Sequence, residues 1–195
     1  MNTLLLLPVG KVEVSLLRDL CAAIPRSLDV ACEILPYVLD PTPSYHPERQ
    51  QYHSSEILQR MQALVRPQDW RFLAIADVDL YIPILKYVFG EAQIAGPCAV
   101  VSIYRLRQEF YGLDRDDALL SQRLLKESIH ELGHTLELRH CQDYGCVMAS
   151  SPAVEWIDLR ETTLCVFCQS RVESKLKPSV RELHQRDIAA RSWSS

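Results

Sequence analysis

Residues 129–140 read Ile-His-Glu-Leu-Gly-His-Thr-Leu-Glu-Leu-Arg-His, and this stretch decides the fold that we expect for the chain. His130 and His134 are four positions apart. On a helix this spacing places both imidazoles on one face, about one turn apart, where both can reach a single zinc ion. Glu131 follows the first histidine and can serve as the base that activates water. The alternative is a surface helix with incidental histidines, and the apolar face of the predicted helix favours the metal site.

A third histidine makes a catalytic site the better interpretation. His140 lies six residues after His134, where the helix must end for a further ligand to fold back. Three protein nitrogens with the fourth position left to water are typical of catalytic zinc sites rather than structural ones. The sequence therefore predicts His130, His134 and His140 as zinc ligands, with Glu131 as the catalytic residue.

Four cysteines predict a second metal site. Cys141, Cys146, Cys165 and Cys168 fall within 28 residues and form two close pairs. Four thiolates in this arrangement suit a tetrahedral structural zinc ion. We expect no export signal, and without one such clustering favours metal over disulfides. The expected cofactors are therefore two zinc ions, one catalytic and one structural.

The stretch from His130 to Cys168 resembles the archaemetzincin family of zinc metallopeptidases, which belongs to the metzincin clan. Met148 suits the Met-turn that lies below the metal in that clan. The resemblance implies a single catalytic domain over residues 1–195, with an upper subdomain of about 1–136 and a lower one of about 137–195 organised by the second zinc. It also implies hydrolysis of peptide bonds, with free amino termini as one candidate point of attack.

Two departures from the metzincin pattern bear on the site. Glu137 stands where the signature has a glycine that lets the chain turn sharply. We expect either a strained turn, at a cost of roughly 1–2 kcal/mol, or a longer helix. Such a cost is small beside zinc binding, which is worth on the order of 10 kcal/mol at structural sites. Ser150 replaces a tyrosine used by some metzincins, so the shape of the substrate pocket is not predicted.

The rest of the chain predicts an α/β fold with a mixed, mostly parallel twisted sheet, because strands and helices alternate in its first half. Residues 141–169 lose periodicity and are expected to be irregular. The expected strands are 4–7, 28–35, 72–78 and 99–106, with a short edge strand at 90–96, and the expected helices are 12–24, closed by Pro25, 54–65, 114–136 and 178–190.

Composition restricts the partners of the protein. The formal net charge is −4, and no local basic run offers a nucleic-acid surface. No segment approaches the roughly 20 apolar residues that cross a bilayer, and the apolar start lacks the basic residues of a signal peptide. We therefore expect a cytoplasmic monomer that binds peptides, and neither nucleic acid nor membrane.

Two other functions remain open at this level. A zinc-ribbon-like binding protein would need only the cysteine site, although the three histidines and Glu131 argue against it. A metzincin fold whose cleft is covered by loops would bind both metals and cleave peptides poorly. Metal counting separates the first alternative from a peptidase, and peptide screening separates the second.

Overall fold

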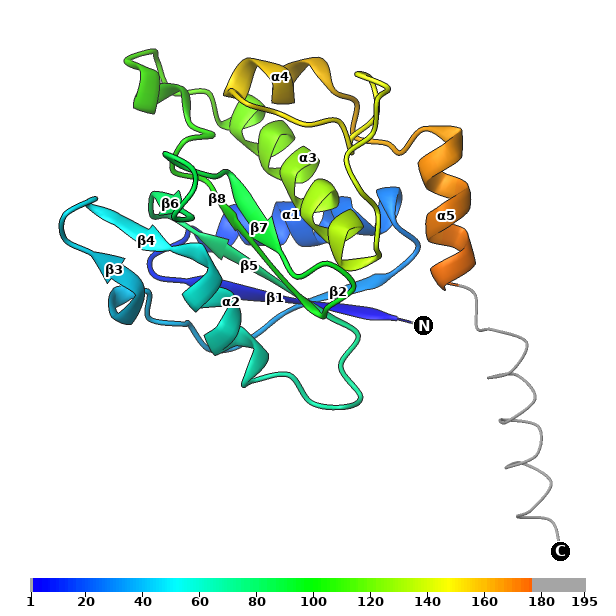
Figure 1. The fold of residues 1–195 in the computed structure, drawn as a ribbon, viewed down its shortest axis with the longest axis horizontal. Coiled ribbons are helices and arrows are strands. Elements are labelled where there is room, and N and C mark those ends of the chain that lie inside the picture. Colours follow the sequence, from blue (N-terminus) through cyan, green and yellow to red (C-terminus); the bar gives the residue numbers. More distant parts are fainter. Residues whose placement is uncertain (1, 177–195) are drawn as a thin grey trace, which may run out of the picture.

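A five-stranded sheet forms the centre of the computed structural model, which describes residues 2–176 of the chain. Four strands are parallel and one edge strand is antiparallel, in the order β2-β1-β5-β8-β7 (Figure 1). The mostly parallel sheet predicted from the sequence is confirmed. The strands are β1 (Thr3–Val9), β2 (Ala31–Ile34), β5 (Arg71–Ala76), β7 (Gly90–Ala92) and β8 (Cys98–Ser102).

Helices cover both faces of this sheet because side chains of its central strands alternate between two cores. In β1, Leu4 and Leu6 pack with α1 and α3, whereas Leu5 and Leu7 pack with α2. A strand buried on both faces is continuously apolar, as this one is. The helices are α1 (Val14–Ser27), α2 (Ser54–Gln62) and α3 (Asp117–Thr135).

A small second sheet lies beside the first, with the strand order β3-β4-β6. Two of its three strands come from residues 45–53, between β2 and β5 in the chain. Its pairings are short, and the described residues also contain two 3₁₀ helices. The elements are η1 (Thr42–Ser44), β3 (Tyr45–His46), β4 (Gln51–His53), β6 (Leu80–Tyr81) and η2 (Gln108–Tyr111).

The chain after α3 builds a separate core of its own. Its buried members come from the last turns of α3, from the following loop and from α5 (Val166–Leu176). A short helix, α4 (Val154–Leu159), packs back on the main core instead. The buried residues of the separate core are Ile129, Leu136, Leu138, Cys146, Val147, Met148, Cys168 and Val172.

The long helix runs from Asp117 to Thr135, which lies within the predicted range 114–136 and starts three residues later. Asp116 caps its first turn, and its carboxylate accepts a hydrogen bond of 2.8 Å from the backbone N–H of Leu119. Its buried face continues down to His130. The helix therefore brings the first two histidines into the interior, at the boundary between the main core and the separate core.

Two predictions about the elements need correction, and a third is not tested. Pro25 does not close α1, which continues to Ser27 because Ile24 and Leu28 on either side of the proline are buried in the core. The stretch 141–169 is not wholly irregular, since it contains α4 and the start of α5. The helix predicted at 178–190 lies outside the described residues. Within residues 2–176, no helix has the length and apolar character to span a membrane.

Candidate metal centres

The three predicted histidines meet at one point in the structure. His130 and His134 lie one turn apart on α3, with their Nε2 atoms 3.1 Å from each other. The loop after the helix brings His140 to the same place, so that one nitrogen from each ring lies within 4.8 Å of the others. His130 is buried, His134 is half-buried and His140 is exposed. A site with this gradient of burial is open to solvent on one side.

Backbone carbonyl groups orient two of these rings. The Nδ1 atom of His130 lies 2.9 Å from the carbonyl oxygen of Val147, and that of His134 lies 2.8 Å from the carbonyl oxygen of Leu138. A carbonyl oxygen only accepts, so each of these hydrogen bonds requires a proton on Nδ1. Both Nε2 lone pairs are then available to a metal, which is the usual arrangement around zinc-binding histidines. The residues present therefore fit a zinc ion.

The end of α3 explains how His140 comes back to the other two rings. Glu137 has a positive φ of 66°. Its backbone N–H donates a hydrogen bond of 3.0 Å to the carbonyl oxygen of His134. The N–H of Leu138 donates another of 3.0 Å to the carbonyl oxygen of Gly133. These two bonds form a Schellman motif, in which glycine is the usual residue at the left-handed position. Of the two expected outcomes, the strained turn is the one found, and Glu137 itself is exposed and does not line the cleft.

Met148 lies directly against α3 beside the two helical histidines. A Cβ atom on Gly133 would come within 2.4 Å of the Met148 sulfur, so the methionine packs against the bare backbone of this glycine. Met148 is fully buried in the separate core described above. The structure thus places a methionine where the resemblance to metzincins implies a Met-turn.

Glu131 lies between α3 and the edge strand β7. A Cβ atom on Gly90 would come within 2.7 Å of both Cγ and Oε1 of Glu131, so this strand approaches the carboxylate through a glycine. Burial raises the pKa of Glu131 well above its usual value, and the charges of Glu127 and Glu91 raise it further. A carboxyl group with a raised pKa is suited to taking and returning a proton near neutral pH.

Burial also keeps the three histidines in the neutral form that binds metals. Burial lowers the pKa of His130 well below its usual value, and the positive charge of Arg160 adds to this effect. Burial is also the largest cause of the lowered pKa values of His134 and His140. Neutral imidazole, not imidazolium, binds metals. The surroundings of all three rings therefore favour metal binding.

Arg160 is a residue of the site that the sequence reasoning missed. It is buried and forms an ion pair with the buried Glu127 on α3. Its Nη1 also donates to the carbonyl oxygens of Val147 and Ala149, both at 2.9 Å. The same atom lies 2.9 Å from Nδ1 of His130, which is a close approach of two donors when that Nδ1 is protonated. No periodic pattern surrounds Arg160, so nothing in the sequence signals this role.

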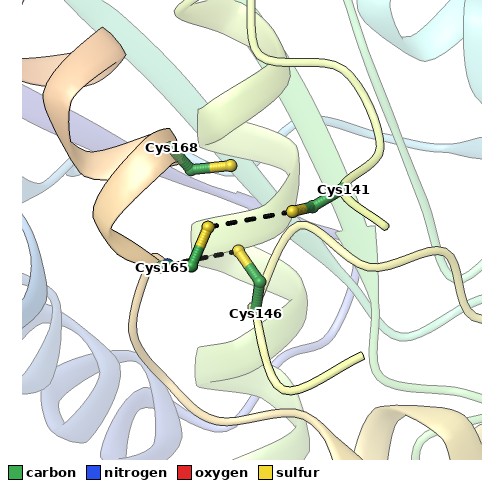
Figure 2. Close-up of side chains that lie close together, drawn as sticks. All are labelled: Cys141, Cys146, Cys165 and Cys168. Atoms are coloured by element: carbon green, nitrogen blue, oxygen red, sulfur yellow. Dashed lines mark hydrogen bonds between the residues drawn. The ribbon is translucent and has the colours of Figure 1, made fainter. Parts of the chain in front are cut away.

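The four predicted cysteines also gather in one cluster. Figure 2 shows Cys141 and Cys146 on the loop after α3, facing Cys165 and Cys168 at the start of α5. The sulfur atoms of Cys141 and Cys165 are 3.8 Å apart, and all four lie within 4.8 Å of one another. All four are free thiols. Hydrogen bonding from the backbone of Cys168 lowers the pKa of Cys165, which favours its thiolate, whereas burial raises the pKa values of Cys146 and Cys168.

A cleft of about 500 Å³ leads to the histidines. Across it, the hydroxyl of Tyr87 donates a hydrogen bond of 3.1 Å to the carbonyl oxygen of Pro152. This bond joins the loop before β7 to the segment after Met148. The lining residues include Leu85, Tyr87, Phe89, Gly90, Glu127, His130, Glu131, His140, Ser150, Ser151, Pro152 and Arg160.

Three features define a zinc metallopeptidase of the metzincin type. They are a mostly parallel sheet with an antiparallel edge strand, two histidines one turn apart near the end of a long helix, and a tight turn back to a third histidine. Residues 44–174 match Peptidase family M54, and the chain belongs to this family. It is 36% identical over 168 residues to an archaemetzincin of Methanocaldococcus jannaschii, covering 86% of this chain and 91% of that protein. An archaemetzincin of Natronomonas pharaonis is 32% identical over 172 residues, covering 86% and 97%.

Solved structures agree with this assignment. The crystal structure of archaemetzincin from Archaeoglobus fulgidus has a TM-score of 0.75 at 30% identity, over 87% of this chain and 99% of that one. A zinc-dependent peptidase from Methanocorpusculum labreanum has a TM-score of 0.78 at 28% identity, over 87% and 99%. The protein is therefore a zinc-dependent peptidase that acts on peptide substrates, and the predicted fold and activity are both confirmed.

Proposed function

We propose that His130, His134 and His140 hold the catalytic zinc ion of this peptidase and that Glu131 is its general base. The observation that carries the proposal is the convergence of three ring nitrogens within 4.8 Å, while carbonyl oxygens bind the far nitrogens of two rings. Zinc bound there would supply Lewis acidity, which activates water and polarises a scissile carbonyl group.

The protein groups around the metal have complementary tasks. Glu131 takes a proton from the attacking water and returns it to the leaving amine. Its raised pKa lets the carboxyl group keep that proton between the two steps. The edge strand β7 offers unpaired backbone groups to an extended peptide, and Gly90 lets that strand approach Glu131. The peptide bond is thereby held beside the base.

A second zinc ion bound by Cys141, Cys146, Cys165 and Cys168 completes the proposal. The ion would join the loop after α3 to α5 and stabilise the separate core between them. This supports a single catalytic domain with an upper subdomain of about residues 1–136 and a lower one of about 137–195. Reduced thiols of this kind suit a cytoplasmic protein.

Replacing Glu131 by glutamine tests the proposed base. We expect Glu131→Gln to lower kcat by at least about a hundredfold, because removal of a positioned general base costs about 10²–10⁴ in rate. Zinc content should stay at two ions per chain. His130→Ala should bind one zinc fewer, whereas Asp114→Asn, on the exposed loop before α3, should change neither quantity. Full activity in Glu131→Gln would disprove the assignment of the base.

Cleavage at free amino termini, the monomeric state and the absence of other partners remain predictions. Peptides with free and acetylated amino termini, compared at equal concentration, test the first of these. The contact between Tyr87 and Pro152 also favours a cleft that is partly closed, so a weakly active enzyme is the second candidate function. Sedimentation equilibrium of the zinc-loaded protein tests the oligomeric state.

A further inference from the structure

A second hollow borders the proposed catalytic metal site. It has a volume of about 600 Å³ and lies between the loop after α3 and the first turn of α5. His140 lines both this hollow and the catalytic cleft, so the two spaces meet at the third proposed ligand. We call it the apolar groove, and its walls include Leu138, Arg139, His140, Val166, Phe167 and Arg171.

Two large apolar side chains stand out from the wall of this groove. Val166 is 89% exposed and Phe167 is 65% exposed. They are adjacent in the first turn of α5 and lie between Cys165 and Cys168, so the four-cysteine cluster holds this turn on both sides. Exposed apolar groups gathered at a hollow mark binding surfaces. A helical turn fixed in advance loses little conformational entropy when a ligand binds.

The direction of β7 shows which part of a substrate would reach the groove. The strand starts at Gly90, beside Glu131 in the cleft. The turn after it approaches the end of α3, where the N–H of Ala95 bonds the carbonyl oxygen of His134 at 3.2 Å. Beyond that end of α3 lies α5, which carries the groove wall (Figure 1). The strand therefore leads from the cleft towards the groove.

A peptide added to this free edge has a defined polarity. Antiparallel pairing is the more stable kind and is the one that β7 already makes with β8. A peptide antiparallel to β7 runs from the groove towards the cleft. Its residues on the amino-terminal side of the scissile bond then lie at the groove, and those on the carboxyl-terminal side lie in the cleft.

We infer that the apolar groove is a substrate subsite, which binds bulky apolar side chains on the amino-terminal side of the scissile bond. The inference rests on the proposed catalytic zinc site, because that site fixes the position of the bond. Val166 and Phe167 supply the apolar contact, and the Arg171 guanidinium stacks 5.6 Å from the centre of the Phe167 ring. The four-cysteine cluster thereby gains a second role, since it orients the first turn of α5, which selects substrates.

Quenched fluorescent peptides that differ only before the cleaved bond test this subsite. The series carries phenylalanine, leucine or serine there, each with a free or an acetylated amino terminus. We expect the native enzyme to cleave the phenylalanine and leucine peptides with kcat/KM at least about tenfold above the serine peptide. In Val166→Ser/Phe167→Ser this preference should vanish, mainly through a higher KM, while zinc content stays unchanged. The free and acetylated pairs show whether a terminal residue or a longer segment occupies the groove.

Controls separate the subsite from other causes. Leu113→Ser removes an equally exposed apolar side chain, 59% exposed, that lines neither hollow, and it should keep the preference. Binding of the same peptides to Glu131→Gln, measured by fluorescence anisotropy, should show the same order without any hydrolysis. This binding measurement tests the groove even if the assignment of the catalytic residues is wrong.

Two results would overturn the inference. The first is a native enzyme, or a Glu131→Gln variant, that does not distinguish phenylalanine from serine at this position. The second is a native enzyme that sediments as a dimer and a double variant that sediments as a monomer, with the preference for phenylalanine over serine unchanged in the variant. That result would assign Val166 and Phe167 to contact between two copies of the chain.

Discussion

At the scale of single residues, the site depends on a few positions where backbone and side chain approach closely. Gly133 admits the sulfur of Met148, and Gly90 admits the carboxylate of Glu131. Glu137 is the converse case. Its φ is positive, in the left-handed region that suits glycine, yet this residue carries a side chain. The helix pattern predicted the place of this turn.

Glu137→Gly should therefore stabilise the zinc-loaded protein. Relief of the left-handed conformation is worth roughly 1–2 kcal/mol, and the greater freedom of glycine in the unfolded chain takes back about 0.4–1 kcal/mol. We expect a net gain of about 1 kcal/mol in the free energy of unfolding, measured by urea denaturation with zinc in excess. Glu137→Ala keeps the strain and removes the carboxylate, so it should give no such gain. An equal gain in both variants would assign the effect to the side chain.

At the scale of elements, the sequence predicted those with strong periodicity and missed those without it. The long helix, the buried strands and the edge strand followed from apolar spacing and turn residues. The helix α4 has only six residues, too few for a periodic pattern to emerge. Ligand types and spacing predicted the histidine and cysteine clusters. The contact of Arg160 with Glu127 joins residues 33 positions apart, and only folding reveals it.

The pair of Arg160 and Glu127 connects α3 to the segment around Met148, and loss of one member should be costly. We expect Arg160→Gln to lower the free energy of unfolding by about 3–5 kcal/mol, because it leaves Glu127 as an unpaired buried charge. The double variant with Glu127→Gln should recover part of this loss in a double-mutant cycle. Arg115→Gln, which breaks an exposed pair with Asp117, should cost no more than about 1 kcal/mol. Similar losses in both single variants would contradict a buried linkage.

At the scale of the whole molecule, the upper sheet and the lower loops face each other across the cleft, and access depends on how firmly they are joined. Tyr87 and Pro152 provide one direct bond between the two sides. The sequence could not predict it, since the segment after Met148 departs from the pattern on which the resemblance rests. Closure of this kind would limit the size of the substrates that enter the cleft, and it would have less effect on the rate of the chemical step at the metal.

Tyr87→Phe removes this bond and keeps the ring. A hydrogen bond is worth about 1 kcal/mol net, which corresponds to about a fivefold shift between closed and open forms. We expect kcat/KM for peptides of ten or more residues to rise by up to about fivefold, with little change for tripeptides. Tyr144→Phe, at a tyrosine that is 72% exposed and does not line the cleft, should have no effect. A uniform change for peptides of all lengths would point to a role other than access.

His140 and Cys141 are neighbours in the chain, so a single peptide bond links the two proposed ligand clusters. Oxidation of the cysteines would release the loop that carries the third imidazole, although no cysteine takes part in hydrolysis. A peptidase built in this way should lose activity under peroxide and regain it with a thiol reductant and fresh zinc. The oxidation state of these four thiols would thus set how much of the enzyme is active.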